Sequence, residues 1–320
     1  MDNALINKIE GSLLKLRMYQ AQRTLSIEKY WQMTSFTKLR SRFSEKYAYA
    51  NRYDCSAFML DFWNKKCLEL EKRFLPYPPF SFLRDKTIRA TMNISEGYAF
   101  WLLQKYLQFL ETRLSEDYLS NMLQEDYVGE QIILNSKYMT SYETVQHLYH
   151  FLKLADFGCK IDDVSSVVEW GGGYGDMAKL FVRMNSNRNV SYTIIDIPIM
   201  SCLQWLYLSS IFGEGKVKII QDRGERIDNG KINLLPISLV EKCDINADLF
   251  ISTWALSECT NYAQDYVVNK NWFNARNILL AYQYNTSEVP NAERLGRLAE
   301  QSGANVQEME IVPRHHYAFR

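Results

Sequence analysis

The sequence has no excess charge of either sign. Its 320 residues contain 37 lysines and arginines and 37 aspartates and glutamates, so the formal net charge is zero. Binding to nucleic acid or to an anionic membrane surface is favoured by clustered positive charge, which this balance does not supply. We therefore expect no nucleic-acid partner.

Long hydrophobic runs and paired cysteines are also missing. The most apolar long segment, residues 197–213, contains Gln204 and several serines, so it predicts a buried helix and not a membrane span. The N-terminus breaks each apolar stretch with Lys, Glu or Arg, unlike a signal peptide. The six cysteines form no C-x-x-C pair, which favours reduced thiols. These absences together predict a cytoplasmic protein.

The two parts of the chain have different patterns. Residues 1–157 carry apolar side chains at helical spacing, as in the stretches 5–14 and 101–114, and show little strand signal. They predict a helical N-terminal domain. Its last helix is expected to start with a capping box formed by Thr140 and Glu143, and to end at Gly158.

Residues 158–320 alternate between strand and helix signals. The strand signals "SVVEW", "VSYTIID", "ADLFIST" and "NILLAYQ" are separated by helices expected near 176–184, 198–213, 261–274 and, after the last of them, 291–302. Such alternation predicts a Rossmann-like α/β domain with a mostly parallel sheet and helices on both faces. Either "KVKII" or "INLLPI" is the expected third strand. The last two strands, near 306–312 and 316–319, are joined by few residues and must pair antiparallel.

A glycine-rich turn follows the first of these strands, in the stretch "VVEWGGGYGDMAKL" at residues 167–180. The dinucleotide pattern G-x-G-x-x-G fails because Asp176 stands where the third glycine belongs. An acid-x-G-x-G-x-G pattern fits instead, with Glu169, Gly171, Gly173 and Gly175. The alternative is a tight turn that holds no ligand.

Asp196 ends the second strand, in "YTIIDIP". A carboxylate at this place accepts hydrogen bonds from ribose hydroxyls, in NAD enzymes as in others. It therefore indicates a ribose site without selecting the cofactor. Alternatively, Asp196 only caps the helix that starts at Pro198.

The glycine turn resembles that of class I S-adenosylmethionine-dependent methyltransferases. The resemblance implies S-adenosylmethionine as the cofactor, a seven-stranded sheet with its last strand antiparallel, and Glu169 as the acid that orients the ammonium group of the cofactor. Residues 164–320 are more specifically similar to the sugar O-methyltransferases of bacterial surface-polysaccharide gene clusters, through "VVEWGGGYGDMAKLF", "YTIIDIPIMSCLQWLYLSSIFG", "INLLPI" and "ADLFISTWALSE". The implied acceptor is a hydroxyl of a glycan or nucleotide-sugar precursor.

Three other readings stay open. The "IDIP" segment also resembles the "DLP" of O-methyltransferases that act on phenols or other small molecules. A non-catalytic binding partner that keeps the cofactor fold is the second alternative, and an NAD-dependent oxidoreductase is the third. The helical domain would form a lid, an acceptor-binding layer or a homodimer contact.

Methyl transfer needs the acceptor oxygen, the methyl carbon and the sulfur in line, and a group that accepts the hydroxyl proton. The candidates for that group are Glu258, His315 and His147, and Thr253 lies on the cofactor side in the same "STWALSE" segment as Trp254. Each has a structural alternative, such as a helix-start glutamate for Glu258. His147 and His150 share a helix face, but no carboxylate cluster joins them, so we expect no metal.

Overall fold

The computed structural model describes residues 57–74, 79, 81–91, 96–221 and 224–320. The apolar stretch at 5–14, which could serve the homodimer contact expected of the helical domain, lies outside these residues. In the described part, no helix is both long and apolar enough to span a bilayer.

In the described part of the chain, five α-helices precede the first strand. Apolar residues at helical spacing account for the longer ones: Leu102, Tyr106 and Leu110 of α5 are all buried. The five helices are α3 (Ala57–Phe74), α4 (Lys86–Thr91), α5 (Glu96–Glu111), α6 (Glu116–Leu123) and α7 (Tyr142–Asp156).

Two details of this helical part differ from the sequence prediction. The N-cap of α7 is Ser141, whose hydroxyl accepts a hydrogen bond from the Thr144 amide, so the predicted Thr140 cap is wrong by one residue. Trp101 of α5 was placed on the buried face but is 46% exposed, where it stacks on Tyr98. The spacing of apolar residues predicts which face of a helix is buried, but a large side chain at the border of that face can still be exposed.

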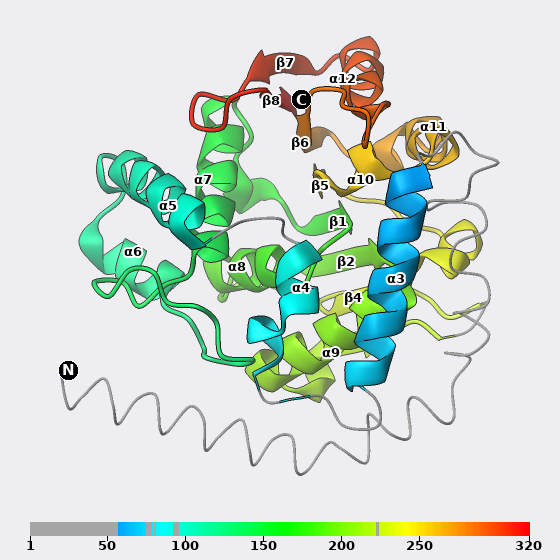
Figure 1. The fold of residues 1–320 in the computed structure, drawn as a ribbon. Coiled ribbons are helices and arrows are strands. Elements are labelled where there is room, and N and C mark those ends of the chain that lie inside the picture. The colour runs from blue at the N-terminus through cyan, green and yellow to red at the C-terminus, as the bar shows by residue number, and fades with distance from the viewer. Residues whose placement is uncertain (1–56, 75–78, 80, 92–95, 222–223) are drawn as a thin grey trace.

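The rest of the chain forms a Rossmann-like sheet with the strand order β3-β4-β2-β1-β5-β6-β8-β7 (Figure 1). Every neighbouring pair is parallel except those that involve β8, which runs antiparallel to β6 and β7. The strands are β1 (Ser166–Trp170), β2 (Ser191–Asp196), β3 (Val217–Ile219), β4 (Ile232–Pro236), β5 (Leu249–Thr253), β6 (Asn277–Gln283), β7 (Asn305–Glu308) and β8 (His315–Phe319).

The predicted fold class and the antiparallel end are thus confirmed, with one strand more than expected in the described sheet. Both segments expected as the third strand form strands: "KVKII" contains β3 and "INLLPI" contains β4. The two strands pair at the edge of the sheet. Four of the helices between the strands lie near the predicted positions, although the one expected at 261–274 ends at Asn269, and a fifth, short helix was not predicted. They are α8 (Asp176–Met184), α9 (Pro198–Phe212), α10 (Ala255–Glu258), α11 (Asn261–Asn269) and α12 (Ala292–Gln301).

Two buried clusters flank the sheet, because alternate strand residues point to opposite faces. Val167, Ile194 and Ile251 belong to the cluster that also contains apolar residues of α5, α7, α8 and α9. Val168 and Ile195 belong to the cluster shared with α10, α11 and α12. The parallel strands therefore have helices on both faces, and their carboxyl ends meet at one edge, where ligands bind in such sheets.

Candidate cofactor and acceptor site

The glycine turn after β1 adopts a backbone that side chains would prevent. Gly171 has a φ of +80°, and a Cβ built there would lie 2.0 Å from the Cβ of Ala255. Gly173 has a φ of +54°, and a Cβ there would meet no atom within 4 Å. Gly171 is therefore required by close packing against the segment after β5, whereas the backbone at Gly173 borders open space that a ligand can occupy. Gly175 follows as the N-cap of α8.

Glu169 lies directly beneath this turn. It is 2% exposed, and its Oε2 accepts a hydrogen bond of 3.0 Å from the hydroxyl of Tyr192. A Cβ on Gly172 would come within 2.9 Å of the same Oε2, so the carboxylate touches the turn. Burial raises the pKa of Glu169 to about 7, because no cation compensates the lost hydration fully.

Asp196 at the end of β2 is joined to the turn through Gln204. Its Oδ2 accepts a hydrogen bond of 2.8 Å from Gln204 Nε2, which also donates to the carbonyl of Gly173 at 2.9 Å. Burial raises the pKa of Asp196 to about 7, against hydrogen bonds that favour the charged form. Asp196 Oδ1 also accepts a hydrogen bond of 2.7 Å from the amide of Ile197, the N-cap of α9, so Asp196 contacts the helix start without bonding an amide of its first turn.

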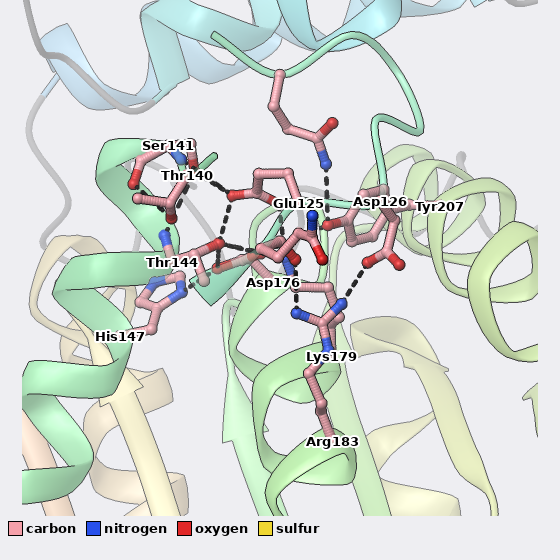
Figure 2. Close-up of polar contacts among 12 residues, drawn as sticks. Glu125, Asp126, Thr140, Ser141, Thr144, His147, Asp176, Lys179, Arg183 and Tyr207 are labelled. Carbon is pink, nitrogen blue, oxygen red and sulfur yellow. Dashed lines mark hydrogen bonds and ion pairs between the residues drawn. The ribbon is translucent and has the colours of Figure 1, made fainter. Parts of the chain in front are cut away.

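A buried cluster of charges lies behind the turn, at the start of α8 (Figure 2). Lys179 Nζ is 2.5 Å from Asp176 Oδ1 and 2.8 Å from Glu125 Oε2, and all three side chains are at most 1% exposed. Thr144 of α7 donates to the Glu125 carboxylate at 2.6 Å. Lys179 and His147 outweigh the effect of burial and keep the pKa of Asp176 well below its ordinary value. The cluster ties the helix that follows the turn to α7.

The two histidines of α7 have different partners. The Nδ1 of His147 lies 2.8 Å from Asp176 Oδ2, and the His147 side chain is 17% exposed. The Nδ1 of His150 lies 2.6 Å from the hydroxyl of Tyr317, and His150 is fully buried. They do not converge on a shared point for a metal ion, and the described residues contain no cluster of histidines, cysteines and acids suited to one.

The segment after β5 carries the remaining candidates. Thr253 is the last residue of β5, and Trp254 after it lies with its ring 6.0 Å from that of His315. The Nδ1 of His315 is bonded to the carbonyl of Pro313 at 3.0 Å. Burial raises the pKa of Glu258 to about 7. A hydrogen bond with the Trp63 side chain offsets part of this rise and places Glu258 against α3.

Most of the predicted residues fall into two groups at one edge of the sheet, whereas His147 lies on α7 against Asp176 and Glu258 lies against α3. In the first group, Gly171, Gly173 and Gly175 form the turn, and Glu169 and Asp196 lie close to it. His315 and Trp254 lie beside them at the ends of β5 and β8. The sequence did not predict that Gln204 contacts Asp196 or that Tyr192 contacts Glu169. The signal for Gln204 was a long polar side chain in a mostly apolar, buried helix.

No family model and no curated protein matches this chain. Among solved structures, the mitomycin 7-O-methyltransferase MmcR aligns with a TM-score of 0.38 at 14% identity, over 75% of this chain and 73% of that chain. Human N-acetylserotonin methyltransferase (ASMT), solved with SAM, gives a TM-score of 0.36 at 13% identity, over 78% and 73%. An O-methyltransferase family protein from Burkholderia thailandensis gives 0.35 at 10% identity, over 81% and 94%.

Two further matches cover less of the compared proteins. The alignment to the pyocyanin biosynthetic protein PhzM covers 56% of that chain at a TM-score of 0.36 and 11% identity, and the alignment to OxaC covers 44% at 0.33 and 9%. This chain therefore spans about half the length of these two proteins or less. Because these identities and TM-scores are low, only the residues of this chain support an assignment of activity.

Proposed function

We propose that the chain is an S-adenosylmethionine-dependent O-methyltransferase. The observation that carries the proposal is the glycine turn with one buried carboxylate beneath it and another bonded to it through Gln204. Glu169 is suited to an ammonium group, and Asp196 to ribose hydroxyls. The open backbone at Gly173 leaves room for the ligand between them. When bound, the cofactor supplies an electrophilic methyl group on a sulfonium.

The charge at the start of α8 argues against a dinucleotide. In NAD-binding folds the pyrophosphate sits at the N-terminus of this helix, where backbone amides attract it. Here the first helical residue is Asp176, a buried acid that Lys179 keeps ionised. A second acid, Glu125, completes a cluster with a net negative charge. This field favours a cationic cofactor and opposes a phosphate.

We assign the proton-accepting role to His147. With Asp176 accepting the hydrogen bond of Nδ1–H, the Nε2 atom of His147 is left with its lone pair, which is the arrangement of a general base held by a carboxylate. A positive charge on the His147 ring would lower the pKa of Glu169, so the two groups interact electrostatically. Glu258 and His315 remain the other candidates.

The acceptor we propose is a hydroxyl of a sugar, in a glycan or a nucleotide-sugar precursor. Its support is the partly exposed Trp254, which can serve as a platform for a ring. Trp254 serves a phenolic ring equally well, so a small phenol is the second candidate. The helical domain at 1–157 would contribute the layer that covers the acceptor.

Calorimetry tests the cofactor assignment. We expect S-adenosylhomocysteine to bind and NADH not to bind. Asp196→Ala should weaken S-adenosylhomocysteine about 10- to 100-fold, since a hydrogen bond to a charged group contributes about 1.5–3 kcal/mol. Asp228→Ala is the matched control, because Asp228 pairs with Lys218 and Lys231 in the connection before β4. Binding of NADH alone would overturn the proposal.

A further inference from the structure

A ring nitrogen of His150 is buried without a hydrogen-bond partner. The residue is fully buried, its Nδ1 is engaged with the Tyr317 hydroxyl at 2.6 Å, and its Nε2 has no partner among the described residues. Leaving a buried polar atom unpaired is unfavourable, so such an atom in a folded protein needs an explanation. A ligand that arrives at this point would supply one.

Trp254 packs beside the His150 ring and is partly exposed. Its ring centroid is 5.8 Å from that of His150 and 6.0 Å from that of His315. The Trp254 backbone has a φ of 65°, an unusual conformation for a bulky residue. The Trp254 amide donates to the Ala281 carbonyl at 2.6 Å, and the Ser257 hydroxyl donates to the Trp254 carbonyl at 2.5 Å. Strain held by surrounding contacts is a feature of functional sites.

This aromatic group adjoins the glycine turn. Ala255, the residue after Trp254, is the one whose side chain would collide with a Cβ on Gly171. The rings of His150, Trp254, His315 and Tyr317 therefore lie next to the proposed cofactor site. Burial lowers the pKa of both histidines, so at neutral pH none of these four rings carries a charge. An uncharged ligand fits them better than a phosphate or a carboxylate.

We propose that His150 Nε2 hydrogen-bonds a hydroxyl group of a neutral, ring-shaped acceptor that packs against Trp254. The assignment rests on the proposed function and names the acceptor-binding group within it. The proposal requires the tautomer in which Nδ1–H donates to the Tyr317 oxygen, because the Nε2 lone pair then accepts a hydrogen bond from the acceptor hydroxyl. His150 fixes the orientation of the acceptor and takes no proton, because its surroundings disfavour an imidazolium. Nε2 is covered in the structure, so the partly exposed Trp254 side chain moves as the acceptor enters.

Nitrogen-15 NMR of the histidine rings tests this assignment directly. The protein is saturated with S-adenosylhomocysteine and titrated with methyl β-D-glucopyranoside in one arm and catechol in the other. We expect the Nε2 resonance that is lost in His150→Phe to shift with one of the two probes. His150→Phe should weaken that probe about 3- to 10-fold, the effect of one neutral hydrogen bond.

His316→Phe is the matched control, since it makes the same substitution at a ring that packs against Tyr282 and Tyr284. It should leave both the probe affinity and the His150 resonance unchanged. A shift with the glycoside identifies a sugar acceptor, and a shift with catechol a phenolic one. If neither probe binds, or if a probe binds without moving the Nε2 resonance, the assignment is wrong. Retained S-adenosylhomocysteine binding in that case leaves the proposed function standing.

Discussion

The two carboxyl groups near the glycine turn differ from ordinary surface acids in their protonation. Glu169 and Asp196 both have pKa values of about 7, and in both cases burial is the largest cause. An acid in this state is partly protonated at neutral pH and becomes fully charged only when a cation or several donors approach. The free site thus holds protons that a bound cofactor with an ammonium group and ribose hydroxyls would displace.

This protonation predicts how cofactor affinity depends on pH. Binding that stabilises the carboxylates lowers their pKa, so affinity for S-adenosylhomocysteine should rise as the pH increases toward about 7 and level off above it. The slope should be at most about tenfold per pH unit for each acid. Calorimetry between about pH 5.5 and about pH 8.5 measures it, and buffers of different ionisation enthalpy should report proton release at the acid end. Asp196→Asn should flatten the curve, and an affinity that falls with rising pH would contradict the explanation.

His147 gives a second prediction for a single residue. If it accepts the hydroxyl proton, His147→Gln should lower kcat about 10²- to 10⁴-fold while S-adenosylhomocysteine affinity changes little. His316→Gln is the control, because the His316 ring stacks between Tyr282 and Tyr284 and does not meet Asp176. The rate of S-adenosylhomocysteine formation with an accepted glycoside or phenol is the measurement. An unchanged kcat would transfer the role to Glu258 or His315.

At the scale of elements, the glycine turn depends on the charges that fix α8. Asp176 and Lys179 lie one turn apart on α8, and Glu125 reaches them from the segment after α6 (Figure 2). Thr144 links the same cluster to α7. The turn is thereby held between β1 and a helix whose first residue is anchored to two neighbouring segments.

Removal of the single lysine from this cluster should be strongly destabilising. Lys179→Met leaves two buried acids without their cation, which costs about 3–5 kcal/mol of the free energy of unfolding. Urea denaturation measures this loss. Lys218→Met removes a partly exposed ion pair with Asp228 and should cost less than about 1 kcal/mol.

The double variant Lys179→Met with Glu125→Gln separates charge from packing. It should lose less stability than Lys179→Met alone, because one of the unpaired charges is gone. Equal losses in the single and double variants would show that the lysine acts through its packing and not through its charge.

At the scale of the whole molecule, the sequence predicted what local patterns determine. The order of strands and helices, the antiparallel β8, and the place of Glu169 and Asp196 follow from periodicity, from turn residues and from the length of the connections. The Ser141 cap was missed by one residue, because neighbouring Ser and Thr are both good caps. The contacts of Gln204 with Gly173 and of His150 with Tyr317 join residues 31 and 167 positions apart, and no local pattern encodes such pairs.

The division into domains at residue 157 stays a prediction, and the buried cores give it a testable consequence. One apolar cluster runs from Cys67 in α3 to Phe319 in β8, and Phe157 stacks on Phe319 at 4.4 Å between ring centroids. Because helices before residue 158 cover one face of the sheet, the two parts should unfold together. Far-ultraviolet circular dichroism and tryptophan fluorescence should therefore give coincident urea transitions for the whole chain.

The fragment 158–320 sharpens the same test. Without α5 and α7 it would expose the apolar sheet face that those helices cover, so it should bind a hydrophobic dye and show no cooperative transition. The whole chain under the same conditions is the control. A fragment that unfolds cooperatively and still binds S-adenosylhomocysteine would instead establish the second part as an independent domain, with the helices as an added acceptor-binding layer.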